Sequence, residues 1–142
     1  MHVLLAAFVL AGISPQHGIA GAKLGMSKAA VRSVMGTPRS EQSGTNDFGR
    51  YVVYVYPRVT VFFQSGERAT SITTTVRTDR VAGVGVGSTE VQVARSVRGV
   101  RCLTEGRYHH CYVGTWQPGH IVTDFALRGD RVARVTVGFV FN

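Results

Sequence analysis

The sequence predicts an α+β fold, in which two tandem helix-plus-β-meander repeats form one continuous antiparallel sheet with both helices on one face. Three observations predict it: the chain of 142 residues matches itself internally, a helix-capping signal opens each matching segment, and strand-like runs follow each helix. The two units are residues 17–78 and 79–142. A lone unit of roughly 60 residues would bury only about 60% of its unfolded surface, so we expect the units to share a sheet.

The internal match has two parts that occur in the same order. Ala20 matches Ala82 at an offset of 62, and Phe62 matches Phe125 at an offset of 63. Only one residue of net insertion separates the two registers, which indicates a duplicated unit.

Each unit contains one predicted helix with a start and a stop signal. Ser27 is a good N-cap ahead of the segment KAAVRSVM, and Thr89 with Gln92 forms a T-x-x-Q capping box. Gly36 and Gly99 follow these segments and supply the residue type that ends a helix.

Each predicted helix is followed by three strand-like runs. These runs are rich in β-branched and aromatic residues, and turn signals separate them. The expected strands are residues 51–56, 59–64 and 68–76 in the first unit and 109–113, 121–127 and 131–141 in the second.

The first residues indicate export from the cell. Residues 3–10 are an uninterrupted apolar run, and small residues follow it, as in a secretory signal peptide that ends near Ala11. We therefore assign residues 1–11 to a signal peptide and expect a secreted or cell-envelope protein. The alternative is a buried N-terminal strand or helix.

Cys102 and Cys111 are the only cysteines, and in a secreted chain such a close pair indicates one local disulfide. A zinc site with the neighbouring His109 and His110 is the alternative. Zinc normally takes four well-spaced ligands, and no Cys-x-x-Cys or His-x-x-x-His spacing occurs, so we expect no metal and no cofactor.

The string Gly25-Met26-Ser27, a short helix, and then Gly36-Thr37-Pro38 before a Tyr- and Val-rich meander resembles the repeat unit of the β-lactamase-inhibitory-protein-like fold. This fold is related to the domain of the SmpA/OmlA outer-membrane lipoproteins of the β-barrel assembly machinery. The resemblance implies a bacterial protein that binds other proteins, as an inhibitor or in the cell envelope, and does not catalyse a reaction. Unlike the lipoproteins, this chain has no lipobox cysteine.

The sequence contains no recognisable catalytic motif. Neither G-x-S-x-G nor H-E-x-x-H occurs, and the run GVGVGS at residues 83–88 lacks the lysine of a phosphate-binding loop. The net charge of +8 comes from arginines dispersed between Arg32 and Arg134, without a dense basic helix. We therefore expect no nucleic-acid partner, while weak attraction to anionic envelope polymers is possible.

Strand alternation predicts which side chains lie on the open face of the sheet. We place Cys111 toward the helices, and also Phe62 and Phe125, because the alternate register of their strands would bury Asp124. The residues then expected to bind a protein partner on the open face and its loops are Tyr54, Tyr56, Val61, Phe63, Thr73, Tyr112, Trp116, Asp124 and Arg134. In the alternative interpretation, Tyr54 and Tyr56 only cover the sheet, and Trp116 packs within its own loop.

These observations favour a secreted, non-enzymatic protein-binding module that uses the open sheet face. The alternative function is a structural cell-envelope component that binds anionic polymers through its dispersed arginines. A metal enzyme built on His109, His110 and Cys111 is a third hypothesis.

Overall fold

The structure of the protein is a computed structural model that describes residues 12–141. The predicted signal peptide, residues 1–11, lies outside the described residues and stays a prediction.

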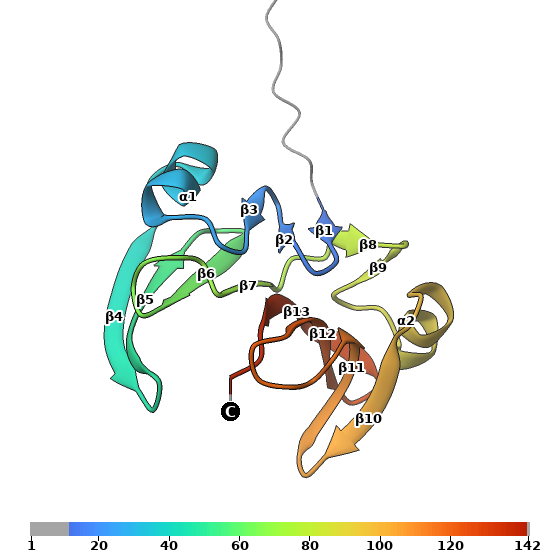
Figure 1. Cartoon of the computed structure of the whole chain (residues 1–142). Coiled ribbons are helices and arrows are strands. Elements are labelled where there is room, and N and C mark those ends of the chain that lie inside the picture. Colours follow the sequence, from blue (N-terminus) through green and yellow to red (C-terminus); the bar gives the residue numbers. More distant parts are fainter. Residues whose placement is uncertain (1–11, 142) are drawn as a thin grey trace, which may run out of the picture.

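Two stretches of chain follow one another, and in each of them short strands precede one helix and four further strands follow it (Figure 1). Three short strands precede the helix of the first stretch, and two precede the helix of the second. The first contains β1 (Ile13–Ser14), β2 (Gly18–Ile19), β3 (Ala22–Lys23), α1 (Lys28–Met35), β4 (Ser40–Asn46), β5 (Gly49–Val55), β6 (Val59–Gln64) and β7 (Ser71–Thr74). The second contains β8 (Arg80–Val81), β9 (Val84–Gly85), α2 (Glu90–Ser96), β10 (Arg101–Glu105), β11 (Tyr108–Gly114), β12 (Ile121–Arg128) and β13 (Arg131–Phe139).

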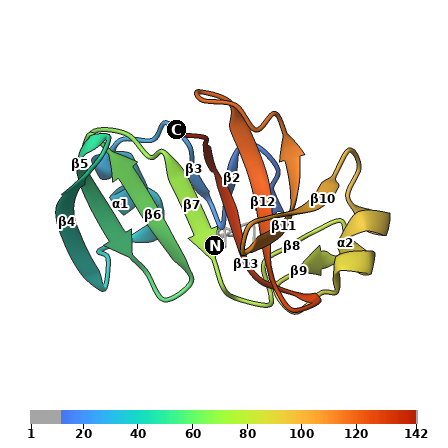
Figure 2. The same cartoon turned by 90° about the horizontal axis from the view of Figure 1, so that it is seen from below.

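One eight-stranded antiparallel sheet dominates the molecule, with the strand order β10-β11-β12-β13-β7-β6-β5-β4. Figure 2 shows these strands side by side, with the short strands β2 and β3 behind them. Each half of the chain contributes a four-strand meander, and the halves join where β13 pairs with β7, from Val135 opposite Thr74 to Gly138 opposite Ser71. Thr73 and Thr136 face each other across this seam, with their hydroxyl oxygens 2.8 Å apart.

The capping signals predict both helix starts correctly. The Ser27 hydroxyl oxygen accepts a hydrogen bond from the Ala30 amide at 3.1 Å, and the Thr89–Gln92 capping box is complete. The helices are short, however, with eight and seven residues. Helix α1 contacts β3, and α2 contacts β9, β10 and β11.

The predicted α+β fold of two helix-plus-meander repeats with both helices on one face is therefore wrong. The protein is predominantly β, because one eight-stranded sheet dominates it and its two helices are only about two turns long. The sequence analysis missed β4, whose residues SEQSGTN are almost all exposed on this edge of the sheet. A strand that is solvated on both sides carries no hydrophobic alternation, so a search for such alternation does not find it. Strand β10 at the opposite edge was also missed, because its five residues include only two half-buried ones, Cys102 and Leu103, which are adjacent and do not alternate.

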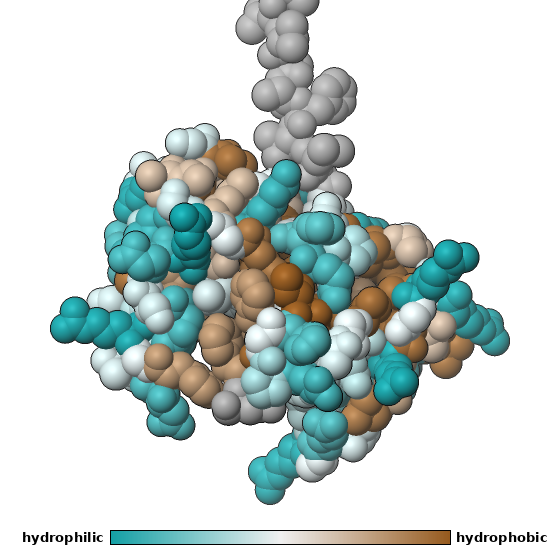
Figure 3. Space-filling view, in the orientation of Figure 1, coloured by the Kyte–Doolittle hydropathy of each residue, from teal (hydrophilic) through white to brown (hydrophobic). Residues whose placement is uncertain are grey.

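The core lies on one face of the sheet, which we call the covered face. Cys111, Phe125 and Val135 lie opposite one another on β11, β12 and β13, and all three are fully buried. Ile72 and Val61 continue this buried layer into the first half. Ile19 and Ala22 of the short strands, together with Val31 of α1, belong to the same core cluster. On the face of the molecule shown in Figure 3, hydrophobic residues gather near the centre and hydrophilic side chains border them.

The predicted outward set in the first half is on the wrong face. Tyr54, Tyr56, Val61 and Phe63 are buried in the core. Tyr54 packs edge-on against Phe63, with ring centroids 4.9 Å apart. The opposite, open face of this half instead carries Phe62, which stacks on Tyr51 at 5.0 Å.

A difference in turn length explains this inversion. The inward residues Phe63 and Ala69 flank the first turn, whereas Leu127 and Val132 flank the corresponding turn of the second half with one residue fewer between them. The sequence repeat pairs Phe62 with Phe125. On the strand before the turn, this alignment is therefore wrong by one residue. Because side chains alternate along a strand, a shift of one residue moves the whole set to the other face.

Candidate functional site

The open face of the second half carries a group of aromatic and charged side chains, which we call the open-face cluster. Alternation along β11 brings Tyr108, His110 and Tyr112 to this face. Asp124 on β12 lies directly opposite Tyr112, and Thr136 on β13 lies opposite Asp124. The cluster consists of Tyr108, His110, Tyr112, Trp116, Asp124 and Arg134.

Asp124 is the hydrogen-bonding centre of this cluster. Its Oδ1 lies 2.6 Å from His110 Nδ1, and its Oδ2 accepts a hydrogen bond from the Tyr108 hydroxyl. Both partners come from β11, so the carboxylate ties the two strands together beyond their backbone pairing.

Aromatic rings enclose His110. Its ring centroid lies 4.5 Å from that of Tyr108, 5.3 Å from Tyr112 and 4.9 Å from Trp116. The side chain is only 1% exposed, and its Nε2 atom is buried without a hydrogen-bond partner among the described residues. His110 is thus held by Asp124 on one side and by apolar ring surface on the others.

Burial controls the protonation of this group. It raises the pKa of the Asp124 carboxyl above its usual value, against the opposing hydrogen bonds from Tyr108 and His110 and the positive charge of Arg134. Burial and the neighbouring Asp124 also raise the pKa of the Tyr108 hydroxyl, which therefore stays protonated and donates. The network is suited to holding the aromatic side chains in place.

A cavity of about 340 Å³ opens beside this network. Tyr108, Trp116, Phe139 and Phe141 contribute aromatic surface to its wall, and Arg134 contributes a cation. The complete lining is Ser71, Tyr108, Trp116, Val122, Asp124, Arg134, Thr136, Gly138, Phe139, Val140 and Phe141. The Arg134 guanidinium carbon lies 5.9 Å from the centroid of the Tyr108 ring, so the cation sits over an aromatic face.

The structure brings together four of the nine predicted binding residues. Tyr112 and Trp116 contact each other, with ring centroids 5.2 Å apart, and Trp116, Asp124 and Arg134 line the same cavity. Thr73 lies beside them through its hydroxyl contact with Thr136.

The other four predicted residues, Tyr54, Tyr56, Val61 and Phe63, lie on the covered face and cannot reach a partner there. The hydroxyls of the two tyrosines bond within the first half: Tyr54 accepts from Arg32 Nε at 3.2 Å, and Tyr56 donates to the Gly36 carbonyl at 2.9 Å. They are structural residues.

Sequence reasoning missed Tyr108 and His110. The signal was present, because both lie two or four positions before Tyr112 and therefore share its face of the strand. The hydrogen bonds to Asp124 depend on the pairing of β11 with β12, which the sequence alone does not give.

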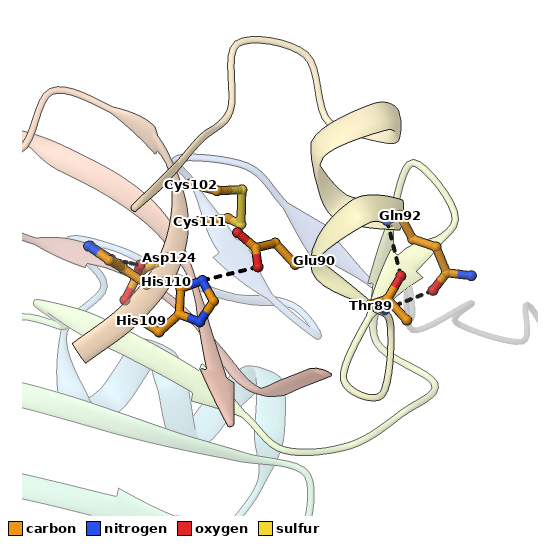
Figure 4. Close-up of a disulfide and its surroundings, with 8 residues drawn as sticks. All are labelled: Thr89, Glu90, Gln92, Cys102, His109, His110, Cys111 and Asp124. Atoms are coloured by element: carbon orange, nitrogen blue, oxygen red, sulfur yellow. Dashed lines mark hydrogen bonds and ion pairs between the residues drawn. A yellow bond between two sulfur atoms is a disulfide. The ribbon is translucent and has the colours of Figure 1, made fainter. Parts of the chain in front are cut away.

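The predicted disulfide between Cys102 and Cys111 is present and joins directly opposed residues of β10 and β11 (Figure 4). A carboxylate oxygen of Glu90 lies within 4.8 Å of both sulfur atoms, and Glu90 also pairs with His109 Nε2 at 3.1 Å. Joined in a disulfide, the sulfur atoms offer no thiolate to a metal ion. His109 and His110 are also consecutive on a strand, so they point to opposite faces and do not converge.

No protein-family model matches the chain, and no curated protein matches it. Among the described residues, no helix is long and apolar enough to cross a membrane.

Two solved structures are similar to this chain. One is a cysteine-rich secretory protein from Staphylococcus aureus subsp. aureus Mu50, with a TM-score of 0.55 and 12% identity over 91% of this chain and 48% of that chain. The other is an extracellular protein containing a SCP domain from Bacillus anthracis str. Ames, with a TM-score of 0.52 and 10% identity over 82% of this chain and 44% of that chain. At such identities the similarity shows the fold alone, and this chain spans about half the length of either structure.

These neighbours correct the resemblance drawn from the sequence. The similar structures are secretory and extracellular proteins described by an SCP or cysteine-rich secretory domain, not proteins of the β-lactamase-inhibitory or SmpA/OmlA type. The resemblance depended on the short string around Gly25 to Pro38, which encodes a helix cap and a helix stop. Such local signals occur in many folds and do not define a family.

Proposed function

We propose that this chain is a secreted, non-enzymatic binding module whose open-face cluster binds an acidic, extended segment of a protein partner. Two solved structures with this fold belong to proteins described as secretory or extracellular, which supports the location. The single observation that carries the binding role is the cavity on the open face, which combines an aromatic wall with the Arg134 cation.

The shape and chemistry of the cavity suit a peptide side chain. Tryptophan, tyrosine and arginine are the residues that most often carry the binding energy of protein interfaces. Trp116 and Phe139 offer apolar surface, while Ser71 and Thr136 add hydroxyl groups to the lining of the cavity. A cavity of about 340 Å³ accommodates one large side chain and its neighbouring backbone.

Charge favours an acidic partner. The chain carries a net charge of +8. Arg134 is exposed and forms no salt bridge within the described residues, so its guanidinium is available to a carboxylate. A partner peptide could therefore place an acidic side chain on Arg134 and a neighbouring aromatic or aliphatic side chain against Trp116.

The buried position of His110 supports a binding role over a catalytic one. A general acid or base must reach the proton that it transfers, but aromatic rings and Asp124 surround His110. The His110–Asp124 pair instead anchors Tyr108 and Trp116 in fixed positions. A preorganised aromatic surface loses less entropy when a partner binds.

The test is a selection of peptides from a random displayed library on the immobilised, disulfide-bonded chain. We expect the selected peptides to combine an acidic residue with an aromatic or large aliphatic one. The substitutions Trp116→Ala and Arg134→Ala should each weaken binding of a selected peptide by about tenfold or more.

Tyr51→Ala is the matched control, because it removes an aromatic side chain from the open face of the other half. It should leave peptide binding unchanged. Equal losses in Tyr51→Ala and Trp116→Ala, or a selection without acidic enrichment, would contradict the proposal.

A further inference from the structure

A second hollow lies on a different part of the molecule, between the β8–β9 hairpin, α2 and the start of β13. It has a volume of about 370 Å³ and is lined by polar and backbone groups. Its lining is Arg77, Arg80, Gly83, Val84, Val86, Gly87, Ser88, Gln92, Ser96 and Arg131. We call it the arginine pocket.

Three arginines from three different segments converge on this pocket. Arg80 Nη1 donates to the Gly83 carbonyl at 2.9 Å, and Arg131 Nη1 donates to the Gly87 carbonyl at 2.9 Å. These contacts use one side of each guanidinium fork and leave further N–H groups for a ligand.

Arg77 is positioned by a glycine. A Cβ atom added at Gly87 would lie only 3.1 Å from Arg77 Nη1, so the guanidinium rests in the space that a side chain would occupy. Gly87 also has a φ of +92°, which L side chains rarely adopt. A side chain at position 87 would therefore be strained by this φ and would crowd the Arg77 guanidinium.

Within residues 12–141, no carboxylate lines the pocket to balance these charges. The nearest acidic residue in sequence, Asp79, is fully buried and is already paired with Arg58 and with the Thr74 hydroxyl. Asp130 precedes Arg131 in the β12–β13 turn but does not line the pocket. Three neighbouring guanidinium groups repel one another, and a bound anion would relieve this repulsion.

The other polar side chains in the pocket can also donate hydrogen bonds. Gln92 Oε1 accepts from the Thr89 amide at 2.8 Å, which leaves the Nε2 amino group turned away from the cap (Figure 4). Ser88 and Ser96 add hydroxyl groups. A pocket with many donors and no acidic acceptor is suited to an oxyanion with several oxygen atoms.

We propose that the arginine pocket binds phosphate, either as the free anion or as the phosphodiester of an anionic polymer. Guanidinium forks match the geometry of phosphate oxygens and bind them in pairs. The site is separate from the open-face cluster and does not depend on it. It uses arginine side chains rather than a phosphate-binding loop, which agrees with the missing lysine in the run at residues 83–88.

The first half supplies an internal control. Arg68 Nη1 donates to the Gly25 carbonyl at 2.9 Å, just as Arg131 does to Gly87. At the offset of 62, however, the positions of Arg77 and Arg80 correspond to Pro15 and Gly18. Arg68 therefore keeps the backbone contact but lacks the two further cations.

The test measures binding of two probes, inorganic phosphate and poly(glycerol phosphate), to the disulfide-bonded chain by calorimetry and by amide chemical shifts. We expect at least one probe to bind and to shift the amide signals of Gly87 and Ser88. Arg77→Gln should weaken its binding by about tenfold, because it removes a charge-assisted contact. Arg77 forms no hydrogen bond among the described residues, so this change should leave the thermal unfolding midpoint unaltered.

Arg68→Gln is the matched control and should bind both probes like the wild type. Binding of phosphate alone would assign the site to the free anion, and tighter binding of the polymer would assign it to the phosphodiester. Absence of binding by both probes would overturn the proposal. An equal loss in Arg68→Gln and Arg77→Gln would also overturn it, since binding would then follow net charge rather than the pocket.

Discussion

The open face of the sheet differs between the two halves, although both halves build a four-strand meander. In the first half, Tyr51 and Phe62 stack on each other on neighbouring strands, with ring centroids 5.0 Å apart. In the second half, the Tyr108–Asp124–His110 network supports a hollow next to Trp116. On its open face the first half packs Tyr51 against Phe62, whereas the second half carries the cavity beside Trp116. The first half also has a hollow of about 490 Å³ beside Tyr51, but Arg50, Glu67 and small polar residues line most of it.

The covered faces are more alike than the open faces. Val61, Phe63 and Ile72 in the first half are as fully buried as Phe125 and Val135 in the second. The covered face therefore holds the common core of both halves, while the side chains of the open face differ between them.

The largest expected effect tests which phenylalanine of β6 belongs to the core. Phe63 is fully buried on the covered face, whereas its neighbour Phe62 is only half-buried on the open face. Phe63→Ala should lower the free energy of unfolding by about 3–5 kcal/mol, because it leaves a cavity. Phe62→Ala should cost about 1 kcal/mol, in proportion to the smaller loss of buried area. Urea unfolding of both variants measures the difference, and the reverse order would show that our assignment of faces is wrong.

The second prediction concerns the disulfide, which exists only in the second half of the described chain. Replacing Cys102 and Cys111 together with alanine should lower the free energy of unfolding by about 2–3 kcal/mol, since the crosslink closes a short loop. The protein should remain folded, because the backbone pairing of β10 with β11 does not need the crosslink. Denaturant unfolding with and without a reducing agent checks this, and complete unfolding of the reduced protein at room temperature would refute it.

The third prediction removes the centre of the open-face cluster. Asp124→Ala would leave His110 Nδ1 and the Tyr108 hydroxyl without their partner, at a cost of about 2 kcal/mol. It should also weaken peptide binding at the cavity, because Trp116 loses the support of a fixed His110 ring. Unfolding and binding titrations on the same variant measure both effects. Loss of stability without loss of binding would separate the network from the site.

The raised pKa of Asp124 gives this network a pH dependence. Burial raises the folded-state pKa above the ordinary value of 3.8, so folding favours the protonated carboxyl. The stabilisation is fully present below pH 3.8 and is lost as the pH rises through the folded-state pKa. As the pH rises through this pKa, we therefore expect the free energy of unfolding of the wild type to fall relative to that of Asp124→Asn. Parallel stability curves for the two proteins would contradict it.

The smallest expected effect lies at the seam between the halves. Thr136→Val removes the hydroxyl contact with Thr73 and keeps the shape of the side chain. The free energy of unfolding should fall by about 1 kcal/mol, the usual net value of one hydrogen bond. Thermal unfolding should still show one transition, since β7 and β13 remain paired through their backbones. Two separate transitions would show that the halves unfold independently.

Signals that act within a few residues were predictable from the sequence. The Ser27 cap and the Thr89–Gln92 box mark the helix starts, and the hydrophobic strand at residues 59–64 coincides with β6. The disulfide follows from two cysteines close in sequence. Each of these features depends on neighbouring residues alone.

Features that depend on pairing between distant segments were not predictable. The face of β6 depends on the number of residues in the turn between Phe63 and Ala69, and a repeat alignment cannot resolve a shift of one residue there. The polar strand β4 is recognisable only through its pairing with β5. The contact of His110 with Asp124 likewise requires the register of β11 on β12.

The central claim is that the second half of the open face is the binding surface, and Trp116 reports on it directly because it is the only tryptophan of the chain. The decisive measurement is a titration of the fluorescence of Trp116 with an acidic peptide obtained from the selection. We predict a saturable shift to shorter wavelength that Arg134→Ala weakens by about tenfold and Tyr51→Ala leaves intact. The account would be contradicted if the peptide bound saturably without changing the Trp116 spectrum and if Tyr51→Ala abolished that binding. The binding surface would then lie in the first half.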